Sequence, residues 1–178
     1  MASLDGTRGG EGQHLMDELE QAAAFLFKEA RHLDKGEWAE WILMYREDAV
    51  YWLPAWRDEY ETTADPQTEV SLIYHNTRLG LEERIARIES RKSITALPLP
   101  RTLHQISNVE LRALAPEYIE TEATFAVHVY DPRTAKEHTR YGRYEHVIFK
   151  GSDTWQIAKK KIILVNDRVP AVLDFYSI

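Results

Sequence analysis

Apolar positions in the first part of the chain recur every three or four residues. This spacing predicts an amphipathic helix from about residue 13, and Gly36 stands where a glycine commonly ends a helix. A shorter helix is expected over 37–45 and a third over 79–90. The apolar stripes of these helices are Leu15, Leu19, Ala22, Ala23, Leu26 and Ala30, then Trp38, Trp41, Ile42 and Tyr45, and finally Leu81, Ile85 and Ile88.

Beyond residue 48 the pattern changes to extended segments rich in β-branched and aromatic residues. Short strands are predicted over 49–53, 70–74 and 173–178, and long ones over 102–114, 117–130, 139–150 and 154–166. In 117–130, apolar and polar residues alternate, as in a strand with one packed and one polar face. Residues 55–69 are polar and predict a long surface loop, a type of segment that is usually functional or mobile.

Helices followed by a run of antiparallel strands indicate the α+β class, with helices packed on one face of a sheet that curls into a half-open cone. The length of 178 residues suits one domain, which we place at 13–178. Residues 1–12 hold four of the eight glycines and are expected to form a flexible tail.

Composition excludes several kinds of chemistry. The chain has no cysteine, which rules out disulfides, zinc–thiolate sites, a cysteine nucleophile and thiolate-ligated iron–sulfur clusters. A net charge of −7 argues against nucleic acid as a partner. Neither a membrane-spanning run nor a secretory signal is visible, so we expect a cytoplasmic protein.

The sequence offers residues for two kinds of catalytic site. Iron bound by two histidines and a carboxylate could use His128 with Glu145 or His146, although the histidine spacing is not that of a metal motif. A stand-alone isomerase or dehydratase would instead need a buried acid or base in the cone. Its candidate carboxylates are Asp48, Glu120, Glu122 and Glu145.

Aromatic and basic side chains suggest an interaction surface. Trp56 and Tyr60 stand beside Arg57 in the polar loop, a composition typical of protein interfaces. The run Lys159, Lys160 and Lys161 lies in a predicted strand, where residues 159 and 161 share a face. An edge-protecting or subunit-facing strip is favoured over nucleic-acid binding. A pure interaction module therefore stays open as a third interpretation.

Several segments, taken in order, resemble the small (β) subunit of aromatic-ring-hydroxylating dioxygenases, the Rieske non-heme iron oxygenases. They are Phe25–Gly36, Trp38–Trp41, Tyr51–Pro54, Glu82–Arg87, Arg101–Val109 and Trp155–Lys160. Residues 55–59, 65–67, 71–75 and 80–83 look most like the branch that acts on aromatic carboxylates such as benzoate, anthranilate and terephthalate.

The resemblance implies a cystatin-like fold, shared with nuclear transport factor 2 and ketosteroid isomerase. It also implies a large (α) subunit that carries a Rieske [2Fe–2S] cluster and a mononuclear Fe(II), three large and three small subunits, and a reductase with or without a ferredoxin. The whole enzyme would add both atoms of O2 to an arene, using electrons from NADH. We expect this chain to be its non-catalytic subunit, with no cofactor or membrane contact of its own. A ketosteroid-isomerase-like isomerase or dehydratase is the alternative.

Overall fold

The computed structural model describes residues 7–90, 97–168 and 173–178. Helices come first and strands dominate the remainder of the chain. In order the elements are α1 (Thr7–Lys35), α2 (Trp38–Leu43), β1 (Tyr45–Pro54), β2 (Ser71–His75), α3 (Leu79–Glu89), β3 (Arg101–Leu114), β4 (Tyr118–Asp131), β5 (Lys136–Lys150), β6 (Trp155–Leu164) and the 3₁₀ helix η2 (Phe175–Ser177). The predicted α+β class is confirmed.

The helices form where the apolar periodicity predicts them, with changes at their ends. Helix α1 begins at Thr7, inside the segment expected to be a tail, while residues 1–6 lie outside the described residues. Gly36 ends α1 with φ of 68°, and the N–H of Glu37 returns to the His32 carbonyl at 2.9 Å. Tyr45 opens β1 rather than continuing α2, which ends two residues earlier.

One six-stranded sheet has the order β2-β1-β6-β5-β4-β3. Neighbouring strands are antiparallel except β1 and β6, which are parallel. The four long strands confirm their predictions. The prediction of a final strand over 173–178 is wrong. Asp174 and Ser177 instead cap the 3₁₀ helix η2 there. Phe175 and Ile178 are both buried, and two residues three apart would face opposite sides of a strand.

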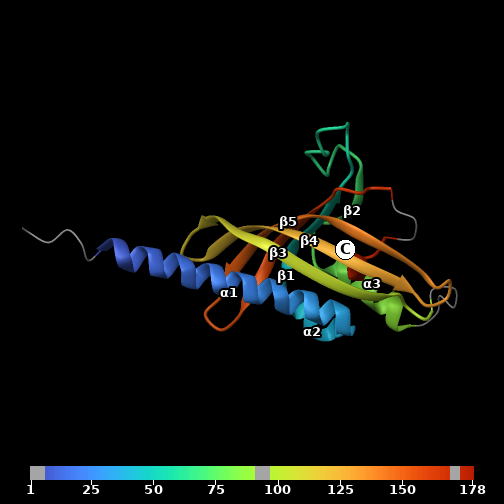
Figure 1. The fold of residues 1–178 in the computed structure, drawn as a ribbon, viewed down its shortest axis with the longest axis horizontal. Coiled ribbons are helices and arrows are strands. Elements are labelled where there is room, and N and C mark those ends of the chain that lie inside the picture. Colours follow the sequence, from blue (N-terminus) through green and yellow to red (C-terminus); the bar gives the residue numbers. More distant parts are fainter. Residues whose placement is uncertain (1–6, 91–96, 169–172) are drawn as a thin grey trace, which may run out of the picture.

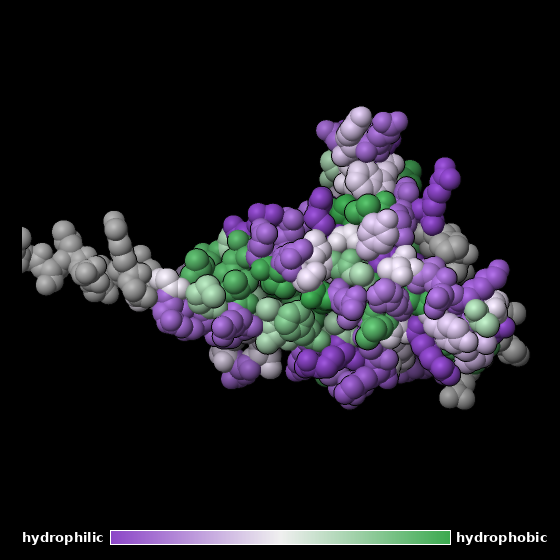
Figure 2. Space-filling view, viewed as in Figure 1, coloured by the Kyte–Doolittle hydropathy of each residue, from purple (hydrophilic) through white to green (hydrophobic). Residues whose placement is uncertain are grey.

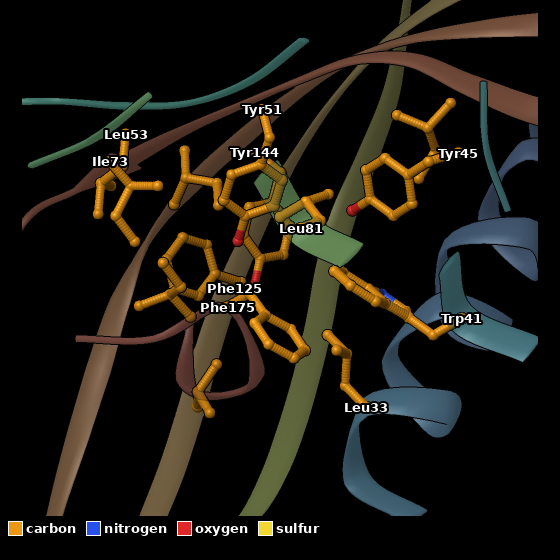
Figure 3. Close-up of a cluster of buried hydrophobic side chains, with 14 of the residues drawn as sticks. Leu33, Trp41, Tyr45, Tyr51, Leu53, Ile73, Leu81, Phe125, Tyr144 and Phe175 are labelled. Carbon is orange, nitrogen blue, oxygen red and sulfur yellow. The ribbon is translucent and has the colours of Figure 1, made fainter. Parts of the chain in front are cut away.

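The sheet curls around the helices, and its concave side holds the core (Figure 1). Helix α1 runs alongside the edge strand β3, where the Asp34 carboxylate accepts a hydrogen bond from the backbone N–H of His104 at 2.9 Å. This contact occupies one backbone group of an otherwise open sheet edge. Figure 3 shows the buried cluster, whose labelled members are Leu33, Trp41, Tyr45, Tyr51, Leu53, Ile73, Leu81, Phe125, Tyr144 and Phe175.

Gly142 in β5 marks a close approach between two strands, and it supports a first prediction. A Cβ atom there would lie 1.9 Å from the carbonyl oxygen of Ile163 on β6. Gly142→Ala should therefore destabilise the protein by about 1–3 kcal/mol, because β5 and β6 must separate. Urea unfolding measures this, with Gly12→Ala as the control. An added Cβ at Gly12 meets no atom within 4 Å. Equal stability of both variants would contradict the predicted clash.

Candidate functional site

The interior of the cone is filled by the C-terminal segment of the chain. Phe175 stacks on Trp41 with 4.7 Å between ring centroids, and its edge meets Trp38 at 5.4 Å. Phe175 and Ile178 have no exposed surface. Arg84 pairs with Asp174 at 3.0 Å and holds the segment in place. Side chains of the protein itself thus occupy the space in which a cone-shaped enzyme would need a substrate pocket.

The cone holds a buried carboxylate, Glu29 on α1, which no sequence pattern had indicated. Lys160 Nζ lies 2.8 and 3.0 Å from the two Glu29 oxygens, and both side chains are 1% exposed. The Tyr45 hydroxyl and the Trp41 Nε1–H also donate to Glu29. Burial acts to raise the pKa of the Glu29 carboxyl, but the charge of Lys160 and the hydrogen bonds from Lys160 and Tyr45 lower it to about 2. A carboxylate held ionised by a lysine is poorly suited to act as a general base.

The carboxylates proposed as catalytic candidates lie elsewhere. Asp48 is exposed, and its hydrogen bonds from Arg46 lower its pKa instead of raising it. Glu122 and Glu145 pair with basic side chains, Arg112 and Lys161 respectively, and Glu120 is exposed. None of the four reaches the interior, because each alternates with the inward-facing residues of its strand. A raised pKa was expected of such a carboxylate only if it were buried, and Asp48 is exposed.

His146 is fully buried beside the Glu29–Lys160 pair, and it supports a second prediction. Thr121 and Lys160 are its cross-strand neighbours, and Tyr144 lies 5.6 Å away. Burial, and then the charge of Lys160, lower the pKa of His146 to about 3. The folded protein therefore keeps this ring neutral, whereas the unfolded chain protonates it below about pH 6.5.

Stability should consequently fall as the pH drops from about 6.5 towards 3, by up to about 1.4 kcal/mol per pH unit from this group. Glu29 adds a loss of the same sign at lower pH, since its pKa is also depressed. Urea unfolding at pH 7.0 and 5.0 should show a smaller difference for His146→Gln than for wild type. His14→Gln is the control, because the His14 side chain is 67% exposed. An unchanged pH dependence in His146→Gln would contradict the assignment.

The segment between β1 and β2, residues 55–70, projects from the body of the molecule and is called the arm below (Figures 1 and 2). Trp56, at its base, donates from Nε1 to the carbonyl of Leu164 at 2.7 Å. Arg57 bonds Glu61 and lies 3.7 Å from Asp58 and 3.9 Å from Glu69. Tyr60, at the tip, is 85% exposed. The three predicted residues thus lie in one segment but make different contacts: Trp56 bonds the body, Arg57 pairs within the arm, and Tyr60 is exposed.

The three lysines of β6 divide between two faces, as the strand geometry predicted. Lys160 points into the core and pairs with Glu29, so its side chain offers nothing to a partner. Lys159 and Lys161 face the other side, 6.0 and 5.3 Å from the Trp52 ring. Lys161 also pairs with Glu145 at 3.2 Å. Of the three lysine candidates, only Lys159 and Lys161 can therefore face a partner, and Lys161 already pairs with a carboxylate of this chain.

The side chains of this molecule do not fit the cofactors of a Rieske oxygenase. A Rieske cluster needs two cysteine ligands, and the chain has none. Over residues 7–90, 97–168 and 173–178, no three His, Asp or Glu side chains are grouped so that they could hold a metal ion. His128 bonds Thr139 and Gln105 rather than standing in a ligand set with His146.

The sequence profile described as "Ring hydroxylating beta subunit" matches residues 28–171. The chain belongs to this family. It is 36% identical over 160 residues to the benzoate 1,2-dioxygenase subunit beta of Acinetobacter baylyi, covering 90% of this chain and 94% of that one. The 2-halobenzoate 1,2-dioxygenase small subunit of Burkholderia cepacia is 38% identical over 155 residues, covering 87% and 93%.

Solved structures agree with this membership. The beta subunit of benzoate 1,2-dioxygenase from Burkholderia mallei superposes with a TM-score of 0.75 and 29% identity over the whole of both chains. An NTF2-like protein with a cystatin-like fold, at TM-score 0.59 and 12% identity, shares the fold alone over 93% of this chain and 94% of that one. The chain is the small subunit of a multicomponent aromatic-ring dioxygenase, and as such it pairs with an α subunit. In the described part, no helix is long and apolar enough to cross a membrane.

Proposed function

We propose that this β subunit is the non-catalytic member of its oxygenase and holds the large subunits in a fixed arrangement. The observation that carries the proposal is the filled cone. Phe175 and Ile178 occupy the interior, and Lys160 keeps the buried Glu29 carboxylate ionised. The chain also lacks the cysteines of a Rieske cluster. Chemistry on the aromatic ring is therefore assigned to the partner.

In this proposal three small and three large subunits form a hexamer. The large subunits carry the Rieske [2Fe–2S] cluster and the mononuclear iron, and a reductase, with or without a ferredoxin, delivers electrons from NADH. The substrate class is an aromatic carboxylate, since the relatives act on benzoate and 2-halobenzoate, as their names state. A ring of three copies suits heterologous contacts, in which two different patches of the subunit meet.

The alternative, a stand-alone isomerase or dehydratase, receives no support from the interior of the cone. Such an enzyme needs an acid or base that can change its protonation state beside a substrate. Here the aromatic rings of Trp41, Phe175, Phe125 and Tyr144 pack against one another instead. The same packing favours a subunit that acts through contacts of its outer surface with partner proteins.

The experiment compares this chain alone, the large subunit alone, and the two purified together. We expect the isolated β subunit to bind no iron and consume no O2. The complex, supplied with its reductase and an aromatic carboxylate, should turn over with equal numbers of the two subunits. Stoichiometric iron in the isolated chain, or O2 uptake by it, would overturn the proposal. So would full activity of the large subunit in its absence.

A further inference from the structure

The arm, residues 55–70, holds its shape through hydrogen bonds of its own. The Asp58 carboxylate accepts from the backbone N–H groups of Tyr60 and Glu61, at 2.8 and 2.9 Å. Glu69 accepts from the backbone N–H groups of Ala64 and Asp65, at 2.6 and 2.8 Å. The tip is therefore presented in one shape, and little conformational freedom remains to be lost on binding.

Two further hydrogen bonds close the base of the arm, next to the bond from Trp56 to Leu164 that joins the arm to the body. Thr63 is 6% exposed, and its hydroxyl donates to the Val70 carbonyl at 2.9 Å. Its backbone N–H donates to the Ala55 carbonyl at 2.8 Å, which closes the base of the arm next to the Trp56 anchor. The tip thus stands out from the body while its base is rigidly attached (Figure 1).

A large aromatic side chain stands at the tip with no covering from the arm itself. Tyr60 is 85% exposed, the highest fraction among the large hydrophobic side chains of the described residues. Tyrosine is one of the residue types that most often dominate binding energy at protein interfaces. A rigid support that holds an exposed tyrosine away from the core has the form of a docking element.

The charge of the arm selects the kind of partner. It carries five carboxylates against the single guanidinium of Arg57, and Arg57 is engaged with three of them: Asp58, Glu61 and Glu69. The backbone hydrogen bonds lower the pKa values of Asp58 and Glu69, so both remain ionised at neutral pH. The arm is accordingly an acidic surface that carries an exposed tyrosine.

A second copy of this chain is a poor match for that surface. Each copy carries a net charge of −7, and identical acidic arms repel one another. The two outward lysines that might receive an arm, Lys159 and Lys161, are already placed against Trp52, and Lys161 also pairs with Glu145. The complementary surface is therefore a basic one on a different protein.

Resting on the proposed function, we infer that the arm docks into a basic groove of the large subunit, with Tyr60 inserted as its anchor. Trp56 and Arg57 are positioning residues in this arrangement, and Tyr60 and Glu59 make the contact. The other predicted candidates on β6 take no part in it.

The test measures binding of the full-length chain to the purified large subunit, by titration at low and at physiological salt. Tyr60→Ala should raise the dissociation constant at least about tenfold, and Glu59→Lys should raise it by a similar factor that shrinks as salt is added. Asp153→Lys is the matched control, because it makes the same charge change in the exposed turn between β5 and β6. All variants should keep the thermal midpoint of the wild type, since the tip lies outside the core.

Light scattering on the same variants, without the large subunit, separates the possible outcomes. Loss of self-association with unchanged binding to the large subunit would overturn the inference and assign the arm to contacts between copies. Unchanged binding and unchanged self-association would overturn it as well. Failure of the wild-type chain to bind the large subunit would instead refute the proposed function.

Discussion

Lys160→Met is expected to lower the free energy of unfolding by about 3–5 kcal/mol, because it leaves Glu29 charged and without its counter-ion in the core. Both side chains are 1% exposed, and Lys160 Nζ contacts both carboxylate oxygens within 3.0 Å. Water cannot replace the lysine there without opening the packing between α1 and β6. Denaturant unfolding with a circular dichroism readout measures the loss.

Two further variants show whether the charge is the cause. Adding Glu29→Gln to Lys160→Met should restore most of the lost stability, because a neutral amide oxygen still accepts from Tyr45 and Trp41. Lys159→Met, one residue along the strand, should cost less than about 1 kcal/mol, since it removes only a partly exposed cation from the neighbourhood of Trp52. Equal losses for Lys160→Met and Lys159→Met would contradict the prediction.

Phe175→Ala should destabilise the protein by about 3–5 kcal/mol. The ring has no exposed surface and lies between Trp41, Trp38 and Tyr176, with centroid distances of 4.7, 5.4 and 5.6 Å. Because Trp38 and Trp41 are held on helix α2, the space left by the ring cannot collapse fully. Thermal unfolding followed by near-ultraviolet circular dichroism would report both the loss and the change in aromatic packing.

The same variant offers an internal check on the cavity. Saturating benzene should raise the thermal midpoint of Phe175→Ala and leave the wild type unchanged, since an apolar cavity of this kind binds small apolar rings. Phe27→Ala is the control for loss of a phenyl ring, because Phe27 is 42% exposed and should cost far less. A loss for Phe175→Ala no larger than for Phe27→Ala would mean that the C-terminal segment does not fill the cone.

Local patterns predicted the elements well because each pattern has a local cause. The spacing of Leu81, Ile85 and Ile88 identified α3, and alternation from Ile119 to Val129 identified the packed face of β4. Gly36 could be assigned to a helix end because its positive φ is a property of one residue. The prediction of a strand over 173–178 failed, because the conformation of this segment depends on the space in the core that Phe175 and Ile178 fill.

The candidate surface was predicted in part. Trp56, Arg57 and Tyr60 were identified as a group by their position in a polar loop, and the arm does bring them together. Their separate roles depend on contacts with distant residues, such as that between Trp56 and Leu164. The burial of Glu29 could not be predicted, because a single glutamate on an amphipathic helix is usually exposed to solvent. Only its partner on β6, Lys160, identifies it as a core residue.

The sequence by itself determined the class of fold, the family and the absence of thiolate chemistry, since periodicity, segment order and cysteine count are all properties of the linear chain. Only the tertiary structure decided that Lys160 is a core residue, that Phe175 fills the cone, and that Tyr60 is more exposed than Trp56 and Arg57. These outcomes depend on contacts between residues far apart in the chain, such as the Lys160–Glu29 hydrogen bonds across 131 positions. Burial and pairing over such separations follow from how the sheet curls, which no local pattern encodes.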